Sequence, residues 1–219
     1  MVAAAADLIP LGAPLTDSFQ KATGNRVRFA FGSSGMLTQQ IRNGAPYDVF
    51  LSANEDFVRS LAEAGDIDRE SVKVYAIGRI ALWSKDGSVK DVGALLDPRV
   101  RHIAIANPAH APYGVAARDL LSRLGLWPKL ASRVVYGENV RQTLQYAESG
   151  NAEAAIVAWS LVFDRGGVLL AANHVPIRQV GGMVSRTRQA AVAARFLVFL
   201  AGPEGQAILK RFGFEPASR

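Results

Sequence analysis

The chain has 219 residues, of which 49% are hydrophobic and 20% are charged, and it contains no cysteine. This composition is typical of an ordinary globular protein, and at roughly 100–200 residues per domain it predicts one large domain or two small lobes. The absence of cysteine excludes a disulfide scaffold, a thiolate metal site, an iron–sulfur cluster and a cysteine nucleophile.

The charge is moderately basic, with 25 Lys and Arg against 19 Asp and Glu, which gives a net charge of +6. The basic residues are scattered, with neither a long block of like charge nor the alternation of aromatic and basic residues that nucleic-acid modules carry. We therefore expect no nucleic-acid partner and interpret the excess charge as a solvated surface.

The predicted elements alternate between strand and helix, which favours an α/β fold with mostly parallel sheets. In the first half of the chain we expect strands at the start of the chain and at residues 26–31 and 47–51, helices at 36–41 and 52–65, and an extended segment at 72–84 that is broken at Gly78. In the second half we expect strands at 103–106, 134–136, 154–157 and 176–184, and helices from Pro112, from Val140, at 189–200 and at 204–211.

Two prolines interrupt the first predicted helix, which follows Asp7. Pro10 fits the opening turn, where the missing N–H has no partner to lose. We expect Pro14 to remove a hydrogen bond and to bend the helix.

The sequence offers little for catalysis. The three histidines, His102, His110 and His174, are far apart, and no H-E-x-x-H motif is present, so we expect no cation site. The segment Gly32-Ser33-Ser34-Gly35 is one residue short of the G-x-S-x-G nucleophile elbow. A serine hydrolase that uses Ser34 with His110 remains an alternative.

Anion binding has better support, because several strand-to-helix junctions carry small or hydroxyl residues. A helix N-terminus exposes unpaired N–H groups and the positive end of the helix dipole, and in open α/β sheets the ligand crevice lies at the carboxyl ends of the strands. Any one junction alone is an ordinary N-cap. The junctions are Ala6-Asp7, Ser33-Ser34, Pro112-Tyr113-Gly114 and Asn139-Val140.

Longer segments carry a resemblance to a known family. The stretch GAPYDVFLSA at 44–53 and the closing KRFGF at 210–214 are specific, whereas the GSSG loop alone is not. Together with residues 4–8, 31–35, 106–114, 138–141 and 202–204, they resemble the molybdate-binding proteins of ABC importers, over essentially the whole chain.

The resemblance implies a type II periplasmic binding fold, in which two α/β lobes are joined by crossover strands and a tetrahedral oxyanion is bound in the cleft. One lobe would comprise residues 1–77 and 181–219, and the other residues 78–180. The implied function is capture of molybdate or tungstate and delivery to the membrane permease of an ABC importer. Sulfate or phosphate is the alternative ligand, and an effector-sensing domain of a transcription regulator is a further alternative.

The same resemblance implies a periplasmic monomer that is not an enzyme and needs no cofactor besides its ligand, with an export signal absent from this chain. The family's ligand residues fall on Asp7 and Ser34 in the first lobe and on Tyr113 and Val140 in the second. Ser34 would supply hydroxyl and backbone donors, and the second-lobe pair mainly backbone N–H groups. Further rim candidates are Ser33, His110 and Trp159.

Two positions depart from the family pattern. A hydroxyl or amide is usual where this chain has Asp7, and a carboxylate about 4 Å from a unit negative charge costs roughly 4 kcal/mol at an effective dielectric constant of 20. Asp7 either turns away to cap its own helix, or is protonated, or accepts a proton from an oxyanion such as hydrogen phosphate. Ala158 stands where some members have a tyrosine, and Trp159 follows it.

Overall fold

The computed structural model describes residues 1–171 and 173–217. Strands and helices alternate along the chain as predicted, and the chain divides into two compact units. Unit 1 comprises Met1–Ile77 and the return segment from Arg178, and unit 2 comprises Gly78–Ile177. The return to unit 1 therefore begins at Arg178, a little before the expected residue 181.

Unit 1 is built on a five-stranded sheet with the strand order β2-β1-β3-β10-β4. Strand β1 runs parallel to β2 and β3, and β10 runs antiparallel to β3. The elements of this unit are β1 (Val2–Ala5), η1 (Ala6–Leu11), α1 (Gly12–Thr23), β2 (Phe29–Gly32), α2 (Ser34–Arg42), β3 (Val49–Ser52), α3 (Glu55–Glu63), η2 (Arg69–Ser71), β4 (Lys73–Gly78), β10 (Ile177–Met183), α7 (Ala190–Ala201) and α8 (Pro203–Arg211).

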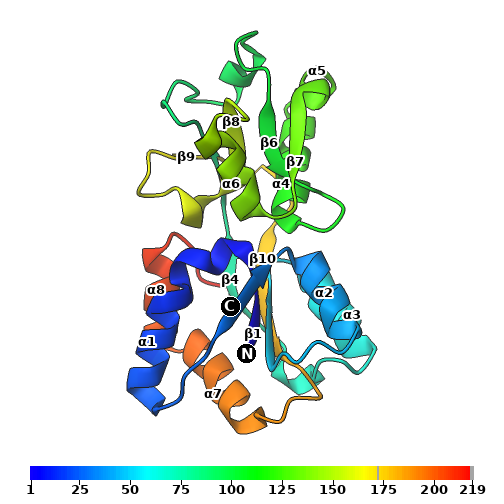
Figure 1. Cartoon of the computed structure of the whole chain (residues 1–219), viewed down its shortest axis with the longest axis vertical. Helices are drawn as coiled ribbons and strands as arrows, with labels where there is room; N and C mark the ends of the chain where they lie inside the picture. Colours follow the sequence, from blue (N-terminus) through cyan, green and yellow to red (C-terminus); the bar gives the residue numbers. More distant parts are fainter. Residues whose placement is uncertain (172, 218–219) are drawn as a thin grey trace. The chain divides into compact units, whose positions relative to one another are not determined.

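Both faces of this sheet are buried, because successive side chains of a strand point to opposite faces. Val2 and Ala4 of β1 pack in one apolar cluster with residues of α1, α7 and α8, whereas Ala3 packs in a second cluster with residues of α2 and α3. Figure 1 shows the two helix layers on either side of the sheet. The apolar strands of the sequence are thus explained by burial on both sides.

Unit 2 repeats this plan with the strand order β7-β6-β8-β5-β9. Strand β6 is parallel to β7 and β8, and β5 is antiparallel to β8. Helices α4 and α6 pack against β6. The elements are β5 (Ile80–Trp83), η3 (Gly93–Leu96), β6 (Ile103–Ala106), α4 (Pro112–Arg123), α5 (Trp127–Leu130), η4 (Ala131–Arg133), β7 (Val134–Gly137), α6 (Val140–Ser149), β8 (Ala154–Ala158), η5 (Trp159–Leu161) and β9 (Val168–Leu169).

The first helix differs from the prediction. Residues Ala6–Leu11 form a 3-10 helix that contains Pro10, and an α-helix begins only at Gly12. Pro14 is the third residue of that α-helix, where a backbone N–H has no partner within the helix. The helix type thus changes at Gly12, two residues before Pro14, and the effect expected of Pro14 on a helical hydrogen bond stays a prediction.

The return segment supplies part of the core of unit 1. Phe196 of α7 is fully buried, and its ring packs edge-on against Phe19 of α1 with 5.2 Å between the ring centroids. In the described part of the chain no single helix is long and apolar enough to cross a membrane, although α7 and α8 together, bent by 59°, reach the length and composition.

We expect Phe196→Ala to lower the free energy of unfolding by about 3–5 kcal/mol, because it removes a buried ring of α7 that packs against α1. Denaturant unfolding followed by circular dichroism measures the change. Val198→Ala is the matched control, since Val198 lies on the same helix and is 65% exposed, and its effect should stay within about 0.5 kcal/mol. Equal losses in the two variants would contradict this account of the core.

Candidate anion-binding site

In unit 1 the predicted site residues lie at one edge of the sheet. Asp7 follows β1, Ser33 and Ser34 follow β2, and Ala53 follows β3. Since these three strands are parallel, their carboxyl ends meet at the same edge. A hydrogen bond from the backbone N–H of Ala53 to Oγ of Ser34, 3.0 Å long, joins two of these junctions.

The two serines have different local roles. Ser33 is the N-cap of α2, and its hydroxyl accepts a hydrogen bond from the N–H of Met36 at 3.4 Å. Ser34 is the first residue of that helix and is fully buried. Oγ of Ser34 accepts from Ala53, and its rotatable hydroxyl hydrogen can also donate to a further acceptor.

Asp7 is fully buried, and its carboxylate is bound to a residue that the sequence reasoning missed. Oδ2 of Asp7 accepts a hydrogen bond from Nε2 of Gln179 at 2.6 Å, and Oε1 of Gln179 accepts from the Tyr75 hydroxyl at 3.1 Å. Burial, and secondly the charge of Asp7, raise the pKa of Tyr75 well above its ordinary value, so this phenol stays protonated and donates. The available signal was a polar Gln179 directly before the apolar stretch from Val180 in the predicted strand 176–184.

In unit 2 the predicted residues also gather at one sheet edge. Tyr113, Val140 and Trp159 follow the parallel strands β6, β7 and β8, respectively. The loops after β6 and β7 are tied together, because the N–H of Asn107 donates to the carbonyl of Gly137 at 2.8 Å.

Helix α4 is held close to the end of β6. A Cβ atom on Gly114 would lie 1.9 Å from the carbonyl oxygen of Ala106, so glycine alone permits this approach. Tyr113 precedes Gly114, is 4% exposed and contributes its N–H to the first turn of the helix. The N–H groups of Gly114 and Val115 donate to the carbonyl of Ala111, and the positive end of the helix dipole lies at this edge, where it favours an anion.

Helix α6 presents a second N-terminus at the same edge. The side chain of Asn139 caps it by accepting from the N–H groups of Arg141 and Gln142 at 3.0 and 3.1 Å. Val140 is the first residue of the helix and is not among the residues whose N–H groups Asn139 caps. Its role as a backbone donor to a ligand stays a prediction.

The rim candidates of unit 2, His110 and Trp159, follow strands β6 and β8 at the same edge of the sheet. Nε2 of His110 is 3.7 Å from Oε2 of Glu138, so an ion pair between the β6 and β7 loops forms when the imidazole is protonated. Trp159 is half-buried and follows Ala158, which is fully buried. Ser34 belongs to unit 1 and His110 to unit 2, so neither unit by itself contains the alternative dyad. Among the described residues, no group of three or more His, Asp or Glu is arranged to hold a metal ion.

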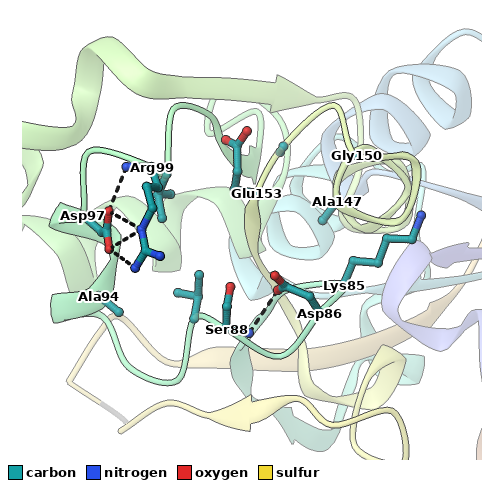
Figure 2. A pocket seen from close by; sticks show the side chains of 12 residues that line it. Lys85, Asp86, Ser88, Ala94, Asp97, Arg99, Ala147, Gly150 and Glu153 are labelled. Atoms are coloured by element: carbon teal, nitrogen blue, oxygen red, sulfur yellow. Dashed lines mark hydrogen bonds and ion pairs between the residues drawn. The ribbon is translucent and has the colours of Figure 1, made fainter.

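A separate pocket of about 440 Å³ opens in unit 2 (Figure 2). It lies where β5 ends and β6 and β8 begin, which is the edge opposite to Tyr113 and Val140. Hydrogen bonds from Arg99 lower the pKa of Asp97 there to about 2, so the pocket presents a carboxylate at neutral pH. None of the predicted site residues is among those that line this pocket.

Comparison with known proteins identifies the family. A sequence model of the bacterial extracellular solute-binding proteins matches residues 1–215. The chain belongs to this family. The chain is 36% identical to the molybdate-binding protein ModA of Rhodobacter capsulatus, over 90% of this chain and 80% of the relative. It is 35% identical to ModA of Azotobacter vinelandii, over 97% of this chain and 88% of the relative.

A solved structure supports the same assignment. The periplasmic molybdate-binding protein of Azotobacter vinelandii superposes with a TM-score of 0.94 at 34% identity, with 99% of each chain covered. The periplasmic binding fold and the resemblance to molybdate-binding proteins, both predicted from the sequence, are confirmed. The two sheet edges described above are thus the candidate ligand-binding surfaces of a solute-binding protein.

Proposed function

We propose that this protein captures molybdate or tungstate in the periplasm and delivers it to the membrane permease of an ABC importer. The main support is the gathering of neutral hydrogen-bond donors at one sheet edge in each unit, at positions where the chain resembles molybdate-binding proteins. In this function the protein is a monomer, is not an enzyme and needs no cofactor besides the bound oxyanion.

The donors suit a tetrahedral dianion. Ser34 offers a buried hydroxyl, and Tyr113 and Val140 offer N–H groups at the starts of helices α4 and α6. Fixed dipoles of this kind bind an anion without a lysine or arginine, because they are already oriented and are shielded from water. Molybdate and tungstate are larger than sulfate, so we propose that the size of the site, more than its charge, selects the ligand.

We propose that the oxyanion is bound by donors from both units and stabilises a closed state that offers both sets at once. Because the ligand binds that state better than an open one, its addition should shift the population toward closure. Small-angle X-ray scattering with and without molybdate tests this step. A decrease in the radius of gyration is expected, and an unchanged value at saturating ligand would exclude closure.

Isothermal titration calorimetry with molybdate, tungstate, sulfate and phosphate tests the ligand. We expect molybdate and tungstate to bind with dissociation constants in the micromolar range or below, on the order of −8 kcal/mol or better, and the smaller anions to bind more weakly. No binding of molybdate or tungstate at micromolar concentrations would refute the proposal. Tighter binding of sulfate or phosphate would establish the alternative ligand instead.

Ser34→Ala tests the unit 1 donor directly. The variant loses one hydrogen bond to a charged group, so molybdate affinity should fall by about 1.5–3 kcal/mol. Ser60→Ala is the control, because the Ser60 hydroxyl is also in unit 1 but donates to the carbonyl of Phe57 on helix α3. An undiminished affinity in Ser34→Ala would remove Ser34 from the site.

A further inference from the structure

A buried chain of hydrogen bonds connects the start of η1 with both strands that link the two units along the chain. It runs from the Tyr75 hydroxyl on β4 to Gln179 on β10, and from the Gln179 amide to the Asp7 carboxylate. Asp7 and Gln179 are fully buried and Tyr75 is 3% exposed. A charged group at such depth is costly unless polar partners compensate for its lost hydration.

The three side chains lie on one side of the sheet of unit 1. Tyr75 packs in the apolar cluster of α1, α7 and α8, together with Leu8 and Leu11 of η1. Val180 packs in the opposite cluster, so its neighbour Gln179 points toward the α1 side. Ser34 begins α2, a helix that packs on the other side. The hydrogen bond from Gln179 therefore draws the Asp7 carboxylate toward the α1 side of the sheet.

The direction of each hydrogen bond follows from the chemistry of the groups. An ionised carboxylate only accepts, so the amide nitrogen of Gln179 must face Asp7. The amide oxygen then faces Tyr75, whose hydroxyl donates to it. The carboxylate thereby selects the orientation of the amide, because a flipped amide would place its oxygen against the carboxylate oxygen, and the hydrogen bond from Tyr75 holds the Gln179 side chain in place.

We propose that Gln179, held by a hydrogen bond from Tyr75, is a positioning residue for ligand binding, which holds the Asp7 carboxylate away from the oxyanion and leaves the start of η1 available to it. The inference rests on the proposed function, and it deepens the account of the same site. It explains how a chain with aspartate at this position binds a dianion. A carboxylate released toward the ligand would repel it, since two negative charges a few ångströms apart disfavour each other strongly where water is excluded.

The test is a double-mutant cycle on molybdate affinity, measured by calorimetry with the whole chain. Gln179→Leu removes the donor at similar volume, and we expect the affinity to fall at least tenfold. Asp7→Asn combined with Gln179→Leu removes the repelling charge as well, so we expect the double variant to regain most of the lost affinity. A residue that acted only through packing would give losses that add, so additive losses would overturn the proposal.

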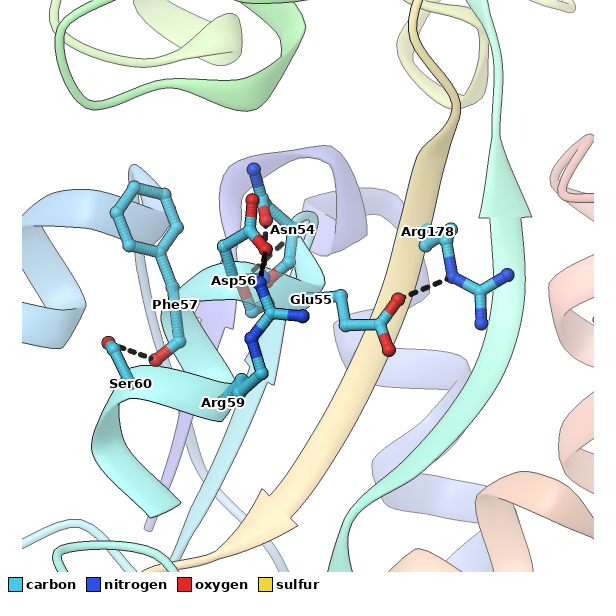
Figure 3. Close-up of polar contacts among 8 residues, drawn as sticks. Asn54, Glu55, Asp56, Phe57, Arg59, Ser60 and Arg178 are labelled. Carbon is cyan, nitrogen blue, oxygen red and sulfur yellow. Dashed lines mark hydrogen bonds and ion pairs between the residues drawn. The ribbon is translucent and has the colours of Figure 1, made fainter. Parts of the chain in front are cut away.

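Tyr75→Phe is a milder variant that keeps the ring in the core and removes only the hydroxyl that donates to Gln179. We expect it to weaken molybdate binding at least threefold, and an unchanged affinity would overturn the role of Tyr75. Arg178→Leu is the control on the same strand, because the Arg178 guanidinium pairs with Glu55 at the half-exposed surface of unit 1, 2.7 Å away (Figure 3). Its affinity should stay within twofold of the wild type.

Unfolding measurements on the unliganded protein distinguish a failure of this inference from a failure of the proposed function. If the wild type binds no oxyanion, the proposed function fails, and the same cycle is then measured as unfolding by denaturant. Gln179→Leu should lower the unfolding midpoint, and adding Asp7→Asn should restore part of it. A midpoint unaffected by Gln179→Leu would show that the amide does not hold the carboxylate.

Discussion

The parallel direction of three adjacent strands in each unit is the constraint on which the candidate site depends. In unit 1 these are β1, β2 and β3, and in unit 2 they are β6, β7 and β8. Each of the parallel strands is followed by a helix, and a helix that follows a parallel strand begins at the carboxyl edge of the sheet. Backbone N–H groups from segments far apart in the chain are thereby collected at one edge, where they are able to bind an anion together.

Glycine residues allow the first turns of these helices to lie close to the ends of the strands. Gly114 brings the first turn of α4 onto the end of β6, and Gly137 does the same between β7 and α6, where a Cβ atom would lie 2.6 Å from Oγ1 of Thr143. Asn139 and Ser33 then cap their helices with side-chain oxygens. The first turns of these helices are consequently held in place by the protein itself, which is what the proposed binding by neutral dipoles requires.

Most charged residues of this chain lie outside the candidate site, and the one charged site candidate is bonded within the core. The net charge of +6 resides on a scattered set of basic residues, while the site candidates are mostly neutral. Asp7 is the exception, and its carboxylate is bonded to a neutral amide within the core of unit 1. The contact joins η1 to β10, which is separated from β1 by β3 in the sheet.

The sequence alone was sufficient for the α/β class, for most strands and helices, and for the junctions at Ser34, Tyr113 and Val140, because these follow from local patterns of apolar residues, caps and glycines. It was not sufficient for the first helix, where the change from 3-10 to α geometry at Gly12 comes before Pro14. Nor did it indicate the partner of Asp7, because Gln179 lies 172 positions away along the chain. Local patterns determine where an element starts and which face it buries, whereas the pairing of two buried polar groups depends on strand order, which only the tertiary structure decides.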